Sequence, residues 1–67
     1  MNLKPVDSSR MSAVGWDSNT MYVEFHNGAV YAYDDVPYEE YEDFISSPSL
    51  GRGLSVFDKR HRYRPVR

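Results

Sequence analysis

Alternation of apolar and polar residues marks three short strands in the first half of the chain. The runs cover residues 11–16, 21–25 and 29–34, and in the second run every other residue is apolar. Clusters of turn-forming residues, 17–19 and 26–28, separate the three runs. Short turns of this kind join antiparallel neighbours, so we expect a three-stranded antiparallel meander.

The second turn admits two registers, and they place the tyrosines on different faces. A two-residue loop of Asn27 and Gly28 pairs Phe25 with Val30, whereas a three-residue loop with Gly28 in a G1 bulge pairs Phe25 with Ala29. A slip of one residue moves every side chain to the other face. Only the bulged register gathers the apolar set on one face, and we therefore predict it. This set is Met21, Val23, Phe25, Tyr31 and Tyr33.

The spacing of apolar residues then changes to that of helices. Pro37 is expected at the first helical position, where its missing N–H is harmless, and Pro48 is expected to end this helix. Tyr38, Tyr41 and the pair Phe44–Ile45 form one predicted apolar stripe.

A second helix is predicted after Ser49, whose hydroxyl suits a helix cap. One face of this helix carries Leu50, Leu54, Phe57 and His61. The tail, residues 62–67, contains Pro65 and is expected to fray. Together the elements predict an α+β fold: a three-stranded antiparallel meander followed by two short helices packed on one apolar face.

Composition limits what such a chain can be. Its 67 residues suffice for one domain, residues 1–67, and the absence of cysteine excludes disulfides and thiolate metal sites. Aromatic residues must supply much of the core, and we expect Trp16, Phe25, Tyr31, Tyr33 and Phe44 there. No apolar run approaches the ~20 residues of a membrane span, and the first residues lack the apolar stretch of a secretory signal. A cytoplasmic protein without a membrane segment is the expectation.

Charge is distributed unevenly along the chain. Residues 1–50 hold two cations and nine anions, a net −7, while residues 51–67 hold six cations and one anion, a net +5. Such a basic end can attract an anionic partner. Alternatively, it folds against the acidic middle of the same domain, and the sequence leaves both interpretations open.

The residues that enzymes use for catalysis are sparse. The two histidines, His26 and His61, lie far apart in the chain, and nothing in the spacing brings a base to Ser8 or Ser9. A metal site needs three or four converging ligands, which scattered carboxylates do not indicate. We therefore expect a binding domain that is not an enzyme and uses no cofactor, no metal and no small-molecule substrate.

The order and spacing of several residues resemble those of a known family. The elements are Ser8-Ser9, Gly15-Trp16-Asp17, Met21-x-Val23-x-Phe25, Gly28, Tyr31-Ala32-Tyr33, Val36-Pro37 and Ser49-x-Gly51. In these elements the chain resembles the KTSC domain, which is named for its occurrence at the C-terminus of some lysyl-tRNA synthetases and also occurs alone in bacteria and phages. Trp16 departs from the family, in which tyrosine is usual. The resemblance implies structural roles for its motif residues Trp16, Gly28, Tyr31, Tyr33, Pro37 and Gly51, and its link to the synthetases makes RNA a candidate ligand.

The C-terminal segment carries the candidate nucleic-acid site, because it interleaves cations with an aromatic ring. Cations attract phosphates, and Tyr63 can stack on an unpaired base. The candidate RNA-binding residues are Arg52, Lys59, Arg60, Arg62, Tyr63, Arg64 and Arg67. The alternative is a protein-interaction or inhibitor module of a phage or mobile element, in which the acidic first helix imitates a nucleic-acid backbone toward a host protein.

Overall fold

The computed structural model describes residues 2–67, and over these residues the chain forms five strands and two helices. In chain order the elements are β1 (Lys4–Pro5), β2 (Met11–Asp17), β3 (Thr20–Phe25), β4 (Val30–Tyr33), α1 (Tyr38–Ile45), α2 (Leu50–Arg60) and β5 (Tyr63–Pro65). The α+β class and the order of meander and helices are as the sequence predicts.

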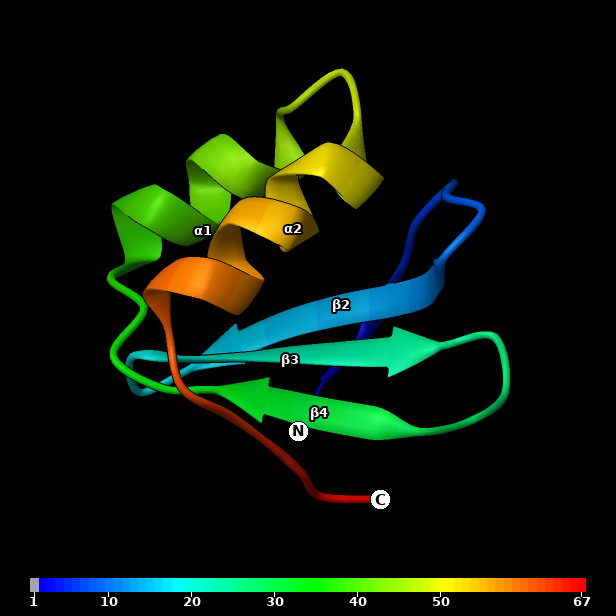
Figure 1. Cartoon of the computed structure of the whole chain (residues 1–67), viewed down its shortest axis with the longest axis horizontal. Helices are drawn as coiled ribbons and strands as arrows, with labels where there is room; N and C mark the ends of the chain where they lie inside the picture. Colours follow the sequence, from blue (N-terminus) through cyan, green and yellow to red (C-terminus); the bar gives the residue numbers. More distant parts are fainter. Residues whose placement is uncertain (1) are drawn as a thin grey trace.

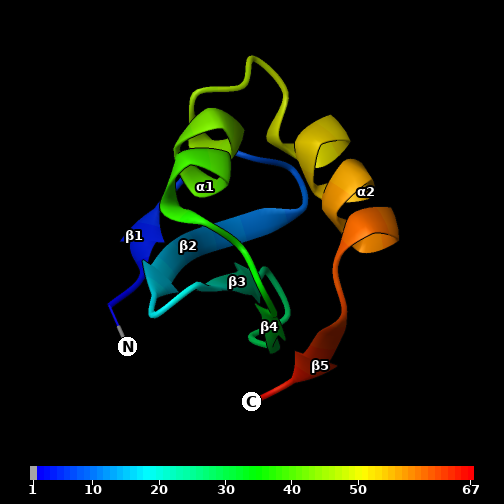
Figure 2. The ribbon, with the colours of Figure 1, turned by 90° about the vertical axis from the view of Figure 1, so that its left-hand side faces the viewer.

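The five strands form one antiparallel sheet in the order β1-β2-β3-β4-β5. Both helices lie on the same side of this sheet (Figure 1). They connect β4 to β5, and α1 lies above the β2 side of the sheet while α2 lies above its β5 side (Figure 2). The fold is therefore a meander whose last connection is a helical pair that covers one face.

The second hairpin adopts the bulged register predicted from its sequence. Val23 lies opposite Tyr31, and Met21 lies opposite Tyr33. The Phe25 N–H donates to the Ala29 carbonyl at 2.8 Å. The loop therefore consists of the three residues 26–28 and not of Asn27 and Gly28 alone. Gly28 has φ +90°, a conformation that glycine adopts without the strain a side chain would cause.

The prediction of three strands is wrong, because the sheet has two further edge strands. The tail that was expected to fray forms β5, in which Tyr63 pairs with Tyr33 and Arg64 with Ala32. Without β5, the outer edge of β4 would leave a row of backbone groups unpaired. Pro65 is compatible with this position because an edge strand tolerates a residue that has no N–H. At the other edge, β1 pairs with β2.

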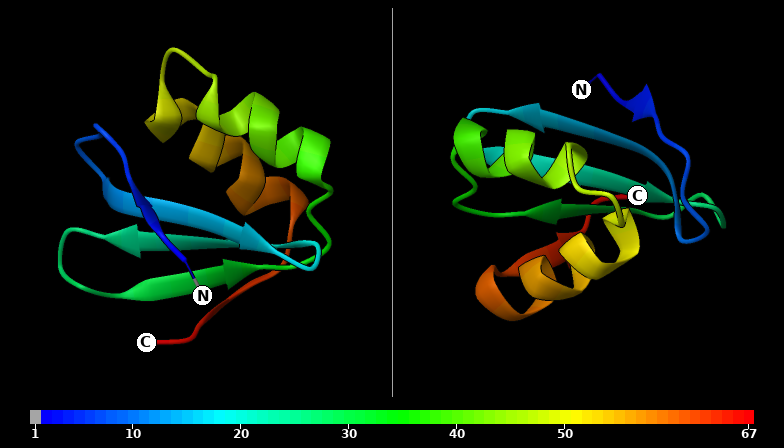
Figure 3. Two further views of the ribbon diagram at one scale, coloured as in Figure 1. Left: turned by 180° about the vertical axis from the view of Figure 1, so that it is seen from behind. Right: turned by 90° about the horizontal axis from the view of Figure 1, so that it is seen from above.

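A close backbone approach explains one glycine of β2. A Cβ atom on Gly15 would lie 2.3 Å from the Asn2 carbonyl oxygen, so a larger residue would displace the N-terminal segment. In the rear view of Figure 3, β1 passes in front of β2. The N-terminal segment can thus lie this close to β2 only because Gly15 has no side chain.

The core lies between the sheet and the helices. It is one cluster of ten buried side chains, contributed by β2, β3, β4, both helices and the loop before α1: Met11, Val14, Met21, Val23, Tyr33, Val36, Tyr41, Phe44, Leu54 and Phe57. Of the five aromatic residues expected in the core, Tyr33 and Phe44 are buried. The other three, Trp16, Phe25 and Tyr31, are partly buried and pack against the cluster.

Both helices begin close to the predicted residues. The Ser49 hydroxyl accepts a hydrogen bond from the Arg52 N–H and caps α2, as expected. Pro37 occupies the N-cap of α1 instead of its first helical position, and its carbonyl accepts from the N–H groups of Glu40 and Tyr41. The predicted apolar stripe of α1 is buried only in its middle, because Tyr38 and Ile45 remain 47% and 40% exposed.

Candidate functional site

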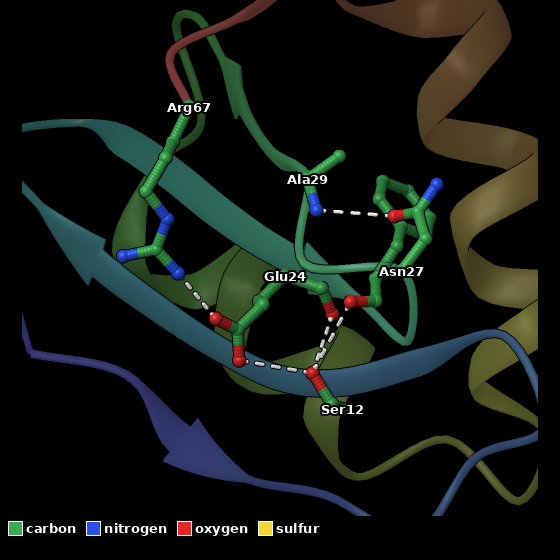
Figure 4. Close-up of polar contacts among 6 residues, drawn as sticks. Ser12, Glu24, Asn27, Ala29 and Arg67 are labelled. Atoms are coloured by element: carbon green, nitrogen blue, oxygen red, sulfur yellow. Dashed lines mark hydrogen bonds and ion pairs between the residues drawn. The ribbon is translucent and has the colours of Figure 1, made fainter.

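The pairing of β5 with β4 fixes the position of the C-terminal cations. Arg64 forms an ion pair with Asp34, which follows β4. Arg67 forms an ion pair with Glu24 of β3, whose carboxylate also accepts from the Ser12 hydroxyl at 2.9 Å (Figure 4). Two of the candidate phosphate-binding arginines therefore already contact carboxylates of the same chain.

The end of α2 contacts the start of α1 in the same manner. Arg60 lies 3.6 Å from the Glu40 carboxylate, and His61 Nε2 lies 2.8 Å from the same group. His61 Nδ1 lies 3.0 Å from the Asp34 carbonyl, so both ring nitrogens face acceptor oxygens. His61 thereby joins the end of α2 to α1 and to the loop after β4.

These contacts support the interpretation that the basic end folds against the acidic middle. Three of the six cations in residues 51–67 pair with acidic residues of the first fifty. The other three, Arg52, Lys59 and Arg62, are exposed and make no ion pair within residues 2–67. The structure thus divides the candidate cations into a paired set and a free set.

A pocket of about 310 Å³, open to solvent and lined largely by aromatic rings, lies beside β5 between the sheet and α2. Its walls come from the segment before β2, the β3–β4 hairpin, α2 and β5: Arg10, Phe25, Asn27, Ala29, Tyr31, Tyr33, Asp58 and Tyr63. We call this site the aromatic pocket. It brings Tyr63, a candidate residue, together with both tyrosines of the Tyr-x-Tyr motif.

The rings of the aromatic pocket contact one another in series. Tyr63 stacks on Tyr33 with the ring centroids 5.2 Å apart and lies 5.9 Å from Tyr31. Tyr31 in turn meets Phe25 edge to face at 5.6 Å. Tyr63 is 50% exposed, so this series of rings extends from the buried Tyr33 to the surface.

Polar contacts at one wall orient Tyr33. The Tyr33 hydroxyl donates to Asp58 Oδ1 at 2.7 Å, and Arg10 lies 3.8 Å from the other carboxylate oxygen. Burial and the hydrogen bond to Asp58 both raise the pKa of the Tyr33 hydroxyl above its ordinary value, burial being the larger cause. Tyr33 therefore remains a hydrogen-bond donor at neutral pH.

The pattern of the KTSC domain matches residues 7–63, which is most of the chain. The chain belongs to the KTSC domain family. Its fold is similar to that in the crystal structure of a KTSC domain protein from Yersinia pestis, with a TM-score of 0.88 and 30% sequence identity, covering 98% of this chain and 97% of that one.

Two bacterial sequences of similar length extend the comparison. A protein of Tsukamurella paurometabola is 36% identical over 66 residues, which cover 96% of this chain and 97% of the relative. An uncharacterized protein of Stutzerimonas stutzeri is 34% identical over 61 residues, covering 88% of this chain and 86% of the relative. The similarity thus spans most of each relative, and neither name states an activity.

The motif residues of the KTSC domain occupy several different environments. Gly28 forms the hairpin bulge, and Pro37 begins α1. The Trp16 Nε1–H donates to the Val36 carbonyl at 2.8 Å, which holds the loop before α1 against β2. The Gly51 carbonyl accepts from the Ser55 hydroxyl at 3.1 Å, within the first turns of α2.

The two tyrosines of the Tyr-x-Tyr motif differ in exposure. Tyr33 is 2% exposed and belongs to the core, whereas Tyr31 is only partly buried and lines the aromatic pocket. The motif therefore links the hydrophobic core to an accessible surface, and a purely structural interpretation describes Tyr33 better than Tyr31.

Sequence reasoning missed the polar wall of the aromatic pocket, Arg10 and Asp58. Asp58 follows Leu54 by four residues, a spacing that places it next to the buried face of α2, so its position was available from the helical pattern. Arg10 lies forty-one residues from the Gly51 carbonyl that its Nη1 contacts at 3.4 Å. Such a long-range contact has no signature in the local sequence.

Ser8 and His26 make hydrogen bonds near the start of β2. Ser8 Oγ accepts from the Arg10 N–H at 3.1 Å just before β2, and His26 Nε2 lies 2.7 Å from the Ser8 carbonyl. Within residues 2–67, no three acidic or histidine side chains converge as metal ligands would. Over the same residues, neither helix has the length and apolar character needed to cross a membrane.

Proposed function

We propose that this KTSC domain binds RNA as a non-enzymatic module, and that contact centres on β5. The observation that carries the proposal is the position of Tyr63, which is half exposed on an edge strand and stacked on a buried tyrosine. Its neighbours in the chain, Arg62 and Arg64, are exposed cations. An exposed ring that stacks on a buried tyrosine suits an unpaired base, and exposed cations next to it in the chain suit the phosphates of the same strand.

The electrostatics of this region favour weak binding that depends on salt. Lys59 and Arg62 are free to contact phosphates, whereas Arg60 and Arg64 must exchange a carboxylate for a phosphate. This exchange costs little, because exposed ion pairs contribute only about 0–1 kcal/mol to stability. The side chains of Arg60 and Arg64 are 63% and 54% exposed.

Binding of a single-stranded RNA octamer at several salt concentrations tests the proposal. Each phosphate contact on a single strand adds about 0.7 to the slope of log K against log salt concentration. We expect a slope of about −1.4 if only Lys59 and Arg62 contact phosphates, and of about −3 if Arg60 and Arg64 join them. A slope near zero, or no binding at low salt, would contradict the proposal.

Two charge-matched variants locate the site. Arg62→Gln should weaken binding and make the slope shallower by about 0.7, because it removes one phosphate contact. Lys4→Gln removes the same charge at the opposite edge of the sheet, in β1, and should leave the slope unchanged. Equal effects of the two variants would indicate attraction by net charge alone.

A second candidate function is protein binding through α1. Three of its four carboxylates, Glu39, Glu42 and Asp43, make no ion pair within the part of the chain that the structure describes. Tyr38 and Ile45 at the ends of the helix are exposed. This surface can present negative charge and apolar side chains to a basic host protein. Association with one host protein after nuclease treatment, abolished by Glu42→Lys with Asp43→Lys, would favour this alternative.

A further inference from the structure

We propose that the aromatic pocket holds one unpaired nucleobase of the bound RNA, with a neighbouring phosphate or a base carbonyl at Arg10. This inference rests on the proposed RNA binding and assigns a specific role to the cavity beside β5.

The walls of the aromatic pocket suit a flat ring. Phe25, Tyr31 and Tyr63 lie outside the cluster of fully buried core residues, and all three line the same cavity. Their planes are mutually inclined, by 86° between Phe25 and Tyr31 and by 52° between Tyr31 and Tyr63. A planar guest can therefore stack on one ring while it meets the edge of another.

The size of the cavity limits the guest to a small one. A volume of about 310 Å³ is at the lower end of the ~300–1,000 Å³ that small-molecule pockets span. The pocket is open to solvent at Tyr63, which is half exposed, so a base that enters can remain attached to a strand outside. This combination suits one nucleotide of a chain and excludes a duplex.

Two residues of the pocket wall, Arg10 and Asn27, carry side-chain N–H donors. The contacts of Arg10 with Gly51 and Ser55 are both 3.4 Å long, near the limit for a hydrogen bond, and its Nε makes none within residues 2–67. Asn27 Oδ1 accepts from the Ala29 N–H at 3.0 Å, which directs the side-chain amide nitrogen elsewhere (Figure 4). Carbonyl groups of a base and phosphate oxygens are acceptors for such donors.

An organic cation is the other kind of guest that aromatic walls attract, and the charges at this pocket do not favour it. Rings of this kind bind quaternary ammonium groups by cation–π attraction. Here the Asp58 carboxylate already accepts from the Tyr33 hydroxyl and lies 3.8 Å from Arg10. Because Arg10 and Asp58 neutralise each other at the wall, no unpaired carboxylate is left for a cation, whereas the Arg10 N–H groups can still donate to an anionic or carbonyl-bearing guest.

Two oligomers of equal charge test the proposal on the unmodified protein. One is an RNA octamer of uridines, and the other is an octamer with the same phosphates in which stable abasic units replace every nucleoside. Stacking of one base on an aromatic side chain corresponds to about a 5- to 150-fold difference in affinity. We expect the uridine octamer to bind more tightly by a factor in this range, as measured by fluorescence anisotropy at low salt.

Variants then place the base in the pocket. Tyr63→Leu should abolish most of the difference between the two oligomers, because it removes the exposed stacking ring. Tyr38→Leu is the matched control, since Tyr38 is also about half exposed but lies on α1, outside the pocket. Circular dichroism confirms that both variants are folded before binding is compared.

The outcomes separate the two proposals. Equal affinity for both octamers overturns the base pocket while leaving RNA binding by charge intact. A preference for uridine that persists in Tyr63→Leu also overturns it, because the base would then lie elsewhere. Absence of binding to either oligomer at low salt overturns the proposed function and the base pocket together.

Discussion

The helix-facing side of the sheet has two halves that are built by the same two strands. In the covered half, Met21, Val23 and Tyr33 are buried beneath the helices. In the open half, Phe25 and Tyr31 are only partly buried and, with Tyr63 of β5, line a cavity. The covered half is closed off from solvent, whereas the open half leaves apolar rings partly exposed around a cavity.

This difference indicates where function can reside. A side chain in the covered half is constrained by its neighbours in a closely packed interior, so its size and shape are fixed by stability. A ring in the open half has solvent on one side and retains its position through other rings. The two halves should therefore respond differently to truncation of their side chains.

The largest expected effect comes from the covered half. Leu54→Ala should lower the free energy of unfolding by about 2–5 kcal/mol, because Leu54 is fully buried and truncation leaves a cavity. Since a domain of this size has only a few kcal/mol of net stability, the variant should be largely unfolded. Urea denaturation followed by circular dichroism measures the effect.

Phe25→Ala is the matching variant in the open half. Because Phe25 already contacts solvent, less apolar area is lost from the interior, and the cost should be about 1–2 kcal/mol. If Phe25→Ala destabilised the domain as much as Leu54→Ala, the distinction between the two halves would be incorrect.

An intermediate effect is expected at the boundary of the two halves, where Tyr33 donates to Asp58. The pKa of Tyr33 is raised by burial and by this hydrogen bond, while in the unfolded chain it is about 10. Below about pH 10 both states keep the proton. Above it, the unfolded state releases the proton first, so the free energy of unfolding should fall as pH rises. Absorbance of tyrosinate, followed together with circular dichroism, should show Tyr33 ionising at a higher pH than a free tyrosine does.

Substitution of Asp58 separates the two causes of the raised pKa of Tyr33, which are burial and the hydrogen bond to Asp58. Asp58→Asn removes the charged acceptor and should lower both the pKa of Tyr33 and the stability at neutral pH, the latter by about 1.5 kcal/mol. Asp43→Asn, an exposed position on α1, serves as the control. An unchanged ionisation of Tyr33 in Asp58→Asn would mean that burial alone sets its pKa.

Much of the fold follows from local patterns in the sequence. The bulged hairpin register required only two facts, a glycine that tolerates positive φ and an apolar set that must share one face. The start of α2 followed from Ser49, and the core face of that helix from the spacing of Leu54 and Phe57. These are local signals, and each agrees with the packing that the whole molecule adopts.

The fifth strand and half of the pocket could not be predicted in this way. The segment Tyr63–Pro65 has two features typical of a tail, a cation and a proline, and what makes it a strand is the unpaired edge of β4 thirty residues earlier. Tyr63 was identified as a candidate because it lies among cations, but its stacking on Tyr33 depends on that pairing. Arg10 reaches the pocket only through contacts with α2, which no short motif encodes.

The smallest expected effect concerns the ion pairs that the C-terminal cations make with the acidic middle. Arg67→Gln removes the pair with Glu24, in which the arginine side chain is 59% exposed, and should cost about 0–1 kcal/mol of stability. The loss should diminish at high salt, because screening weakens exposed pairs. Arg62→Gln, which breaks no ion pair within residues 2–67, is the control for stability. A larger loss would show that these pairs, rather than strand pairing and the rings of the open half, hold β5 against the sheet.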